Sequence, residues 1–145
     1  MALKSGLGKI RRKICAKVVT EKQRPCICVV DDDDAVRDSL ELFLSMKGLK
    51  VLTYGSGQQL LENERNVLPN LLILDIHMPE MDGFELLKQL RQRGIDAPII
   101  LMSGLGDRSI ELRAKNSGVA AFFNKPIDPH ALYQKVVQLI DKSIA

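Results

Sequence analysis

The chain has 145 residues, which is enough for one domain with its own hydrophobic core and no disulfide or metal support. Its residues are 46% hydrophobic and 27% charged, as in soluble globular proteins, and no apolar run approaches the roughly 18 residues of a membrane span. The start lacks the apolar region and cleavage site of a secretory signal, and the three cysteines form no CxxC pair. We therefore expect a reduced, cytoplasmic protein.

Residues 1–24 differ from the rest of the chain in charge. They carry eight Lys or Arg residues and one Glu, a net charge of +7, so the remaining residues carry −4. Three apolar residues recur at every fourth position: Ile10, Ile14 and Val18. This pattern predicts a short basic amphipathic helix over about 9–20. We favour a solvated tail or a helix that caps the domain, and contact with nucleic acid or an anionic membrane is the alternative. Residues 25–145 form the predicted folded domain.

From Pro25 onward, short apolar runs alternate with helical patterns. Five runs have the length of strands: Cys26–Val30, Leu49–Tyr54, Leu71–Leu74, Ile99–Met102 and Val119–Phe123. At least four of them are nearly continuous in apolar residues, which is typical of strands buried on both faces of a parallel sheet. Five strands alternating with five helices predict an α/β fold with a doubly wound parallel sheet.

The helices have apolar stripes and marked starts. The first and the last carry apolar residues at i, i+4, i+7 and i+8: Val36, Leu40, Phe43 and Leu44, then Leu132, Val136, Leu139 and Ile140. Three pairs have the spacing of helix starts: Ser56 with Gln59, Asp82 with Glu85, and Asp128 before Pro129. The fourth helix, Asp107–Ser117, has only a thin stripe of Ile110 and Ala114, so we expect it to be the most loosely held.

Polar side chains stand where strands end. The first, third, fourth and fifth strands are followed by Asp31 to Asp34, by Asp75, by Ser103 and by Lys125. In an open parallel sheet, ligands bind beyond the carboxyl ends of the strands. If the first and third strands are neighbours, Asp31, Asp32 and Asp75 converge on one small site.

Such a cluster predicts a metal and a reactive carboxylate. Two ionised carboxylates 4 Å apart repel by roughly 4 kcal/mol at an effective dielectric near 20. A hard divalent cation relieves this repulsion, and oxygen ligands open to water suit Mg²⁺, with Mn²⁺ as the second choice. Asp75 can then act as a nucleophile on phosphorus, with the Lys125 ammonium as a second cation and the Ser103 hydroxyl as a hydrogen-bond donor.

Each of these residues also has a simpler interpretation. The acidic run alone is typical of a solvated loop or a helix cap, and Asp33 or Asp34 fits the N-cap of the first helix. Ser103 and Lys125 alone are ordinary turn residues. The chain's two histidines are too few for a histidine metal site. The joint occurrence of the acidic run, Asp75, Ser103 and Lys125 at the ends of four strands favours the functional interpretation.

Four blocks, in this order and spacing, resemble the receiver domains of response regulators, the CheY-like family. The blocks are Val29-Val30-Asp31-Asp32, the run LDIHMPEMDG from Leu74 to Gly83, Met102-Ser103-Gly104 and Lys125-Pro126. The resemblance covers roughly residues 25–142. It implies a five-stranded flavodoxin-like sheet in the order 2-1-3-4-5 with five helices.

The resemblance also implies roles for the site residues. Asp75 is then the phosphoacceptor, Asp31 and Asp32 are the metal-binding pair, and the backbone carbonyl of His77 completes the metal shell. Lys125 pairs with the phosphoryl group, as the family's lysine does.

The same resemblance implies a conformational switch. Ser103 is then the hydroxyl that closes on the phosphoryl group, and Phe122 is the aromatic residue that turns inward with it. The bond between Lys125 and Pro126 is expected to be cis. His77 and Leu105 flank the path of the hydrolytic water without an acid or amide to orient it, which predicts slow self-dephosphorylation.

The implied function is a signalling switch rather than an enzyme. A sensor histidine kinase or phosphotransfer protein phosphorylates Asp75, and the fourth helix, fifth strand and fifth helix then bind a partner or form a homodimer. We expect no direct nucleic acid binding by this domain and no membrane contact of residues 1–24. One alternative is an aspartyl-phosphate hydrolase, disfavoured because His77 stands where its second acid belongs. The other is a docking module that is never phosphorylated, disfavoured by the intact residue set.

Overall fold

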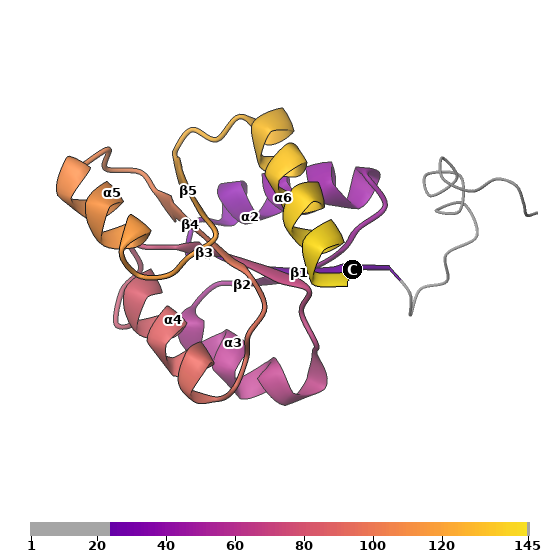
Figure 1. The fold of residues 1–145 in the computed structure, drawn as a ribbon, viewed down its shortest axis with the longest axis horizontal. Coiled ribbons are helices and arrows are strands. Elements are labelled where there is room, and N and C mark those ends of the chain that lie inside the picture. The colour runs from indigo at the N-terminus through magenta and orange to yellow at the C-terminus, as the bar shows by residue number, and fades with distance from the viewer. Residues whose placement is uncertain (1–23, 145) are drawn as a thin grey trace, which may run out of the picture.

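The computed structural model describes residues 24–144, so the helix predicted over 9–20 lies outside the described residues. The described chain forms a parallel five-stranded sheet with helices on both faces (Figure 1). The strand order is β2-β1-β3-β4-β5, which confirms the predicted fold class and order. The strands are β1 (Cys26–Val30), β2 (Lys50–Tyr54), β3 (Leu71–Asp75), β4 (Ile99–Ser103) and β5 (Ala121–Asn124).

Strand β5 lies slightly later in the chain than predicted. The apolar run begins at Val119, but Gly118 adopts a positive φ of 83° and the chain is still leaving the preceding helix there. The ladder with β4 continues to Asn124, which is paired with Ser103. The strand therefore runs to the same edge of the sheet as the functional candidates.

Five α-helices lie among the described residues, with a short 3₁₀ turn, η3 (Glu64–Asn66), after the second. They are α2 (Asp34–Met46), α3 (Gly57–Asn63), α4 (Gly83–Gln92), α5 (Arg108–Lys115) and α6 (Pro129–Ile144). The predicted helix starts are confirmed: Ser56 accepts from the N–H of Gln59, and Asp82 accepts from the N–H of Glu85. Asp33 caps α2. No described helix has the length and apolar content to cross a membrane.

The core consists of two layers, one on each face of the sheet. Residues alternate along β1, so Cys26 and Cys28 face the layer beneath α3 and α4, and Ile27 and Val29 face α2 and α6. Every residue of β1, β3 and β4 is buried. Burial of each such Leu, Ile or Val side chain contributes about 1.5–3 kcal/mol. These three central strands are therefore the rigid support of the site at their ends.

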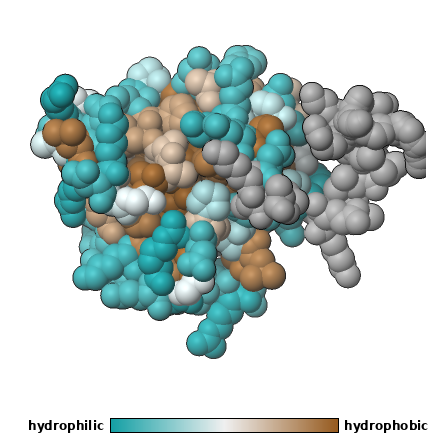
Figure 2. Space-filling view, in the orientation of Figure 1, coloured by the Kyte–Doolittle hydropathy of each residue, from teal (hydrophilic) through white to brown (hydrophobic). Residues whose placement is uncertain are grey.

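Helix α5 is weakly anchored, in agreement with the thin stripe in its sequence. It buries only Ala114, whereas α4 buries five residues, and Leu112 is 49% exposed. Figure 2 shows apolar surface on the viewed face between α5 and α6, while hydrophilic side chains cover the outer sides of the helices. The edge strand β5 beneath this surface has half-buried residues. Helix α5 and strand β5 therefore have few fully buried residues to anchor them.

Candidate functional site

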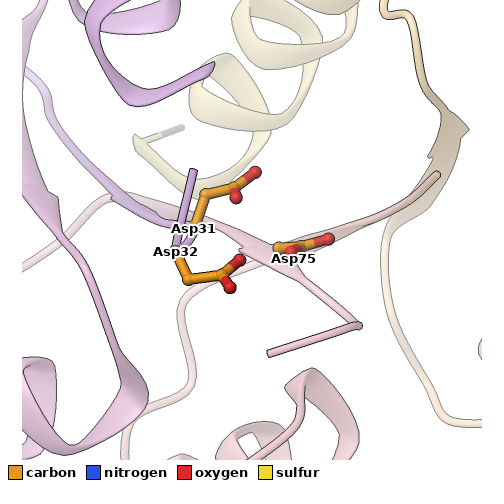
Figure 3. A group of neighbouring side chains, drawn as sticks. All are labelled: Asp31, Asp32 and Asp75. Carbon is orange, nitrogen blue, oxygen red and sulfur yellow. The ribbon is translucent and has the colours of Figure 1, made fainter. Parts of the chain in front are cut away.

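Three carboxylates meet at the carboxyl edge of the sheet. Val30 pairs with Leu74, so the residues that follow in β1 and β3 come side by side. Ligand oxygens of Asp31, Asp32 and Asp75 all lie within 4.8 Å of one another. Figure 3 shows the three side chains projecting to the same side from the ends of β1 and β3. The structure thus brings together the three acidic residues that were predicted to converge.

The cluster is less open to water than we predicted. Asp31 is fully buried, Asp75 is 3% exposed, and only Asp32 is exposed. The turn after β3 folds back tightly on the backbone of Asp75: Gly83 donates its N–H to the carbonyl of Ile76. A Cβ on Gly83 would lie 2.6 Å from the backbone oxygen of Asp75, so glycine is needed for this close approach.

Lys125 supplies the positive charge of the site. Its Nζ lies 2.7 Å from Asp31 Oδ2 and 3.3 Å from Asp75 Oδ1. Burial lowers the pKa of Lys125, but the hydrogen bond to Asp31 and the charges of both aspartates outweigh it, so the pKa is raised. The ammonium therefore stays charged beside the carboxylates. The bond from Lys125 to Pro126 is cis, as predicted.

Asp31 and Asp75 differ in how well they are satisfied. Asp31 accepts the N–H of Asp33 on Oδ1 and the ammonium of Lys125 on Oδ2. Asp75 Oδ1 is buried and has no hydrogen-bond partner, because its 3.3 Å contact with Lys125 is an ion pair without hydrogen-bond geometry. Burial and the charge of Asp31 raise the pKa of Asp75 to about 6, against weaker opposing effects of Lys125 and the His77 backbone. The ionised form of Asp75 is thus destabilised by its surroundings, and Asp31 has partners for both of its carboxylate oxygens.

This arrangement fits a hard divalent cation. A buried carboxylate oxygen without a partner costs free energy, and metal coordination is one way to satisfy it. The donors within reach are carboxylate oxygens, which Mg²⁺ prefers. The side chains of Asp31, Asp32 and Asp75 could therefore hold Mg²⁺.

Ser103 ends β4 next to this cluster and is fully buried. Its Oγ accepts the N–H of Leu105 at 3.2 Å and lies 3.0 Å from Nε2 of His77. This contact between the His77 side chain and Ser103 was not predicted from the sequence. It follows from the register of the sheet, since Asp75 pairs with Met102 and the next residues of both strands reach the same loop region.

Phe122 lies on β5, opposite Leu101 of β4, and packs half-buried against the core layer on the side of α4. It is three residues before Lys125, as the resemblance requires. Its role as a switch residue stays a prediction.

Comparison with known proteins identifies the family of this chain. The model of the response regulator receiver domain family matches residues 27–137. The transcriptional regulatory protein FixJ of Azorhizobium caulinodans is 36% identical over 115 residues, which cover 79% of this chain and 54% of FixJ. The C4-dicarboxylate transport transcriptional regulatory protein DctD of Pseudomonas aeruginosa is 35% identical over 115 residues, 79% of this chain and 25% of DctD. The chain thus spans a quarter to about half of these relatives.

Solved structures are similar as well. A crystal structure of FixJ-N has a TM-score of 0.75 at 30% identity, covering 82% of this chain and 95% of that one. A CheY-like receiver domain protein from Methanospirillum hungatei has a TM-score of 0.76 at 28% identity, again covering 82% of this chain and 95% of the other. The whole described domain, rather than a part of it, therefore has counterparts.

Proposed function

Because the chain belongs to the family of response regulator receiver domains of two-component signalling, we propose that its working group is the Asp75 carboxylate, which accepts a phosphoryl group. The phosphodonor is a sensor histidine kinase or a phosphotransfer protein of the cytoplasm. The observation that carries the proposal is Asp75 Oδ1, a buried carboxylate oxygen with no hydrogen-bond partner, beside a lysine ammonium. An oxygen of this kind is poorly stabilised at rest, which favours a change of state at this carboxylate.

In the proposed reaction, a carboxylate oxygen of Asp75 attacks the phosphorus of a phosphohistidine. The phosphorus–nitrogen bond breaks, its electron pair returns to the imidazole, and an acyl phosphate forms on Asp75. Lys125 would stabilise the negative charge added at Asp75, since its ammonium lies 3.3 Å from Asp75 Oδ1. Cations aimed at the charge of the transferred group are the main source of catalysis in phosphoryl transfer.

Asp31, Asp32 and Asp75 would hold the Mg²⁺, with Mn²⁺ as the alternative ion and the His77 carbonyl as a further ligand. When bound, the ion neutralises charge on the phosphoryl oxygens and on the crowded carboxylates. Asp31 keeps its bonds to Asp33 and Lys125 in the resting site, so it orients the ammonium as well as supplying a ligand.

The new charge on Asp75 is the signal. We propose that the Ser103 hydroxyl and Lys125 close on the phosphoryl group and that Phe122 turns inward. Helix α5 then repacks with β5 and α6, which is the side with least buried anchoring. This face would bind a partner protein or a second copy of the chain, whereas we propose no nucleic acid contact by the domain itself.

Intact-mass analysis tests the proposal. After incubation with acetyl phosphate and Mg²⁺, the wild type should gain one phosphoryl group and Asp75→Asn should gain none. Asp38→Asn, at an exposed aspartate of α2, is the matched control and should behave as wild type. No gain by the wild type would favour a docking module. Sustained turnover of a phosphomonoester would favour the hydrolase instead.

A further inference from the structure

The imidazole of His77 makes a contact for which the proposed function has no role. Its Nε2 lies 3.0 Å from Oγ of Ser103 and joins the turn after β3 to the end of β4. Ser103 is fully buried, and His77 is half-buried. A hydroxyl in such a place needs hydrogen-bond partners, because leaving it unsatisfied is costly.

The direction of this hydrogen bond follows from the other partner of Ser103. The backbone N–H of Leu105 donates to Oγ, so this contact uses an acceptor site of the hydroxyl and leaves its proton free. Asp75 Oδ1 has no hydrogen-bond partner, so the proton is not donated to that oxygen. The remaining partner in contact with Oγ is Nε2 of His77, which can accept this proton when the ring carries its own proton on Nδ1. With that tautomer, the proton of Ser103 points to His77 in the resting domain.

We propose that His77 is a positioning residue that holds the Ser103 hydroxyl in its resting orientation and releases it when Asp75 carries a phosphoryl group. This inference rests on the proposed function. The phosphoryl oxygens are stronger acceptors than an imidazole nitrogen and compete for the same proton. The bond to His77 exists only in the resting state, so it stabilises that state against the phosphorylated one.

Removal of the imidazole nitrogen should therefore favour the state in which Asp75 carries a phosphoryl group. In His77→Leu, the buried proton of Ser103 has lost its acceptor at rest but still finds one on the phosphoryl group. The loss of one buried hydrogen bond corresponds to about a tenfold change in an equilibrium. His77→Gln keeps an acceptor oxygen on a chain of similar reach and should restore the wild-type value.

The probe is beryllium fluoride, a stable phosphoryl mimic, titrated in the presence of Mg²⁺ and followed by ¹⁹F NMR. His77→Leu should bind it about tenfold more tightly than the wild type, and His77→Gln should bind it like the wild type. His130→Leu, at the exposed histidine of α6, is the control and should bind within twofold of the wild type. In a Ser103→Ala background, His77→Leu should have no effect, because the hydroxyl through which it acts is absent.

Equal or weaker binding by His77→Leu would overturn the inference alone, and so would an equal gain in the Ser103→Ala background, which indicates a purely structural role. Absence of binding by the wild type would overturn the proposed function and the inference with it. A second readout keeps the test independent of substitution: long-range ¹H–¹⁵N spectra of the resting wild type should show the tautomer protonated on Nδ1. The Nε2-protonated tautomer would contradict the inference.

Discussion

Replacement of Asp75 by asparagine should make the metal-free protein more stable at neutral pH. Burial and the Asp31 charge raise the pKa of Asp75 from its ordinary 3.8 to about 6. A rise of this size corresponds to about 3 kcal/mol, at 1.36 kcal/mol for each factor of ten in the acid constant. Asparagine has nearly the same shape and no charge to desolvate. The attraction of Lys125 for the ionised carboxylate is already included in this net shift, so we expect a gain of up to about 3 kcal/mol.

The contribution of Asp75 to the free energy of unfolding depends on pH, and its direction follows from the two pKa values. In the unfolded chain Asp75 ionises near pH 3.8, and in the folded chain near pH 6. Between these values only the unfolded state releases the proton, so the contribution of Asp75 to stability falls as the pH rises from about 4 to about 6 and is constant above. The advantage of Asp75→Asn should therefore be complete at pH 7.5 and absent near pH 4.

Urea unfolding in EDTA, at several pH values between 4 and 8, measures this difference directly. Asp38→Asn on the exposed side of α2 should stay within about 0.5 kcal/mol of the wild type at every pH. An Asp75→Asn variant that is no more stable than wild type at pH 7.5, or whose gain is the same at pH 4, would refute the reasoning.

Three further predictions concern the metal, the turn after β3 and the acyl phosphate. Mg²⁺ should raise the melting temperature of the wild type by binding only the folded state, and the rise should be much smaller in Asp75→Asn; equal rises would contradict a metal held by this cluster. Gly83→Ala should destabilise the protein by about 1–3 kcal/mol, because the new Cβ would lie 2.6 Å from the Asp75 carbonyl oxygen, whereas Gly104→Ala, with its nearest atom at 3.7 Å, should cost less in the same unfolding assay. The acyl phosphate should decay slowly, since neither His77 nor Leu105 offers an acid or amide to orient water; radiolabel loss with a half-life of seconds would disprove this.

The sequence predicted the fold and the acidic cluster because their signals are local. Continuous apolar runs mark buried strands, and an aspartate at the end of such a run must lie at the sheet edge. Asp33, Ser56 and Asp82 act as caps through hydrogen bonds to residues two or three positions away, and such contacts follow from spacing alone.

The remaining features depend on contacts between distant segments. Asp75 is 3% exposed, and its position after an apolar run does not by itself show this. The contact of His77 with Ser103 joins residues 26 positions apart and requires the packing of β3 against β4. The partnerless oxygen of Asp75 likewise appears only when Lys125 is seen to sit closer to Asp31.

The most direct measurement is to locate the phosphoryl group. Borohydride reduces an acyl phosphate to an alcohol, so a phosphorylated aspartate becomes homoserine and can be identified by peptide mass spectrometry. After treatment with acetyl phosphate and Mg²⁺, homoserine should be found at position 75 and at no other aspartate, and EDTA should abolish it. Reduction at Asp31 or Asp32 instead, or at no position in a folded sample, would contradict the account.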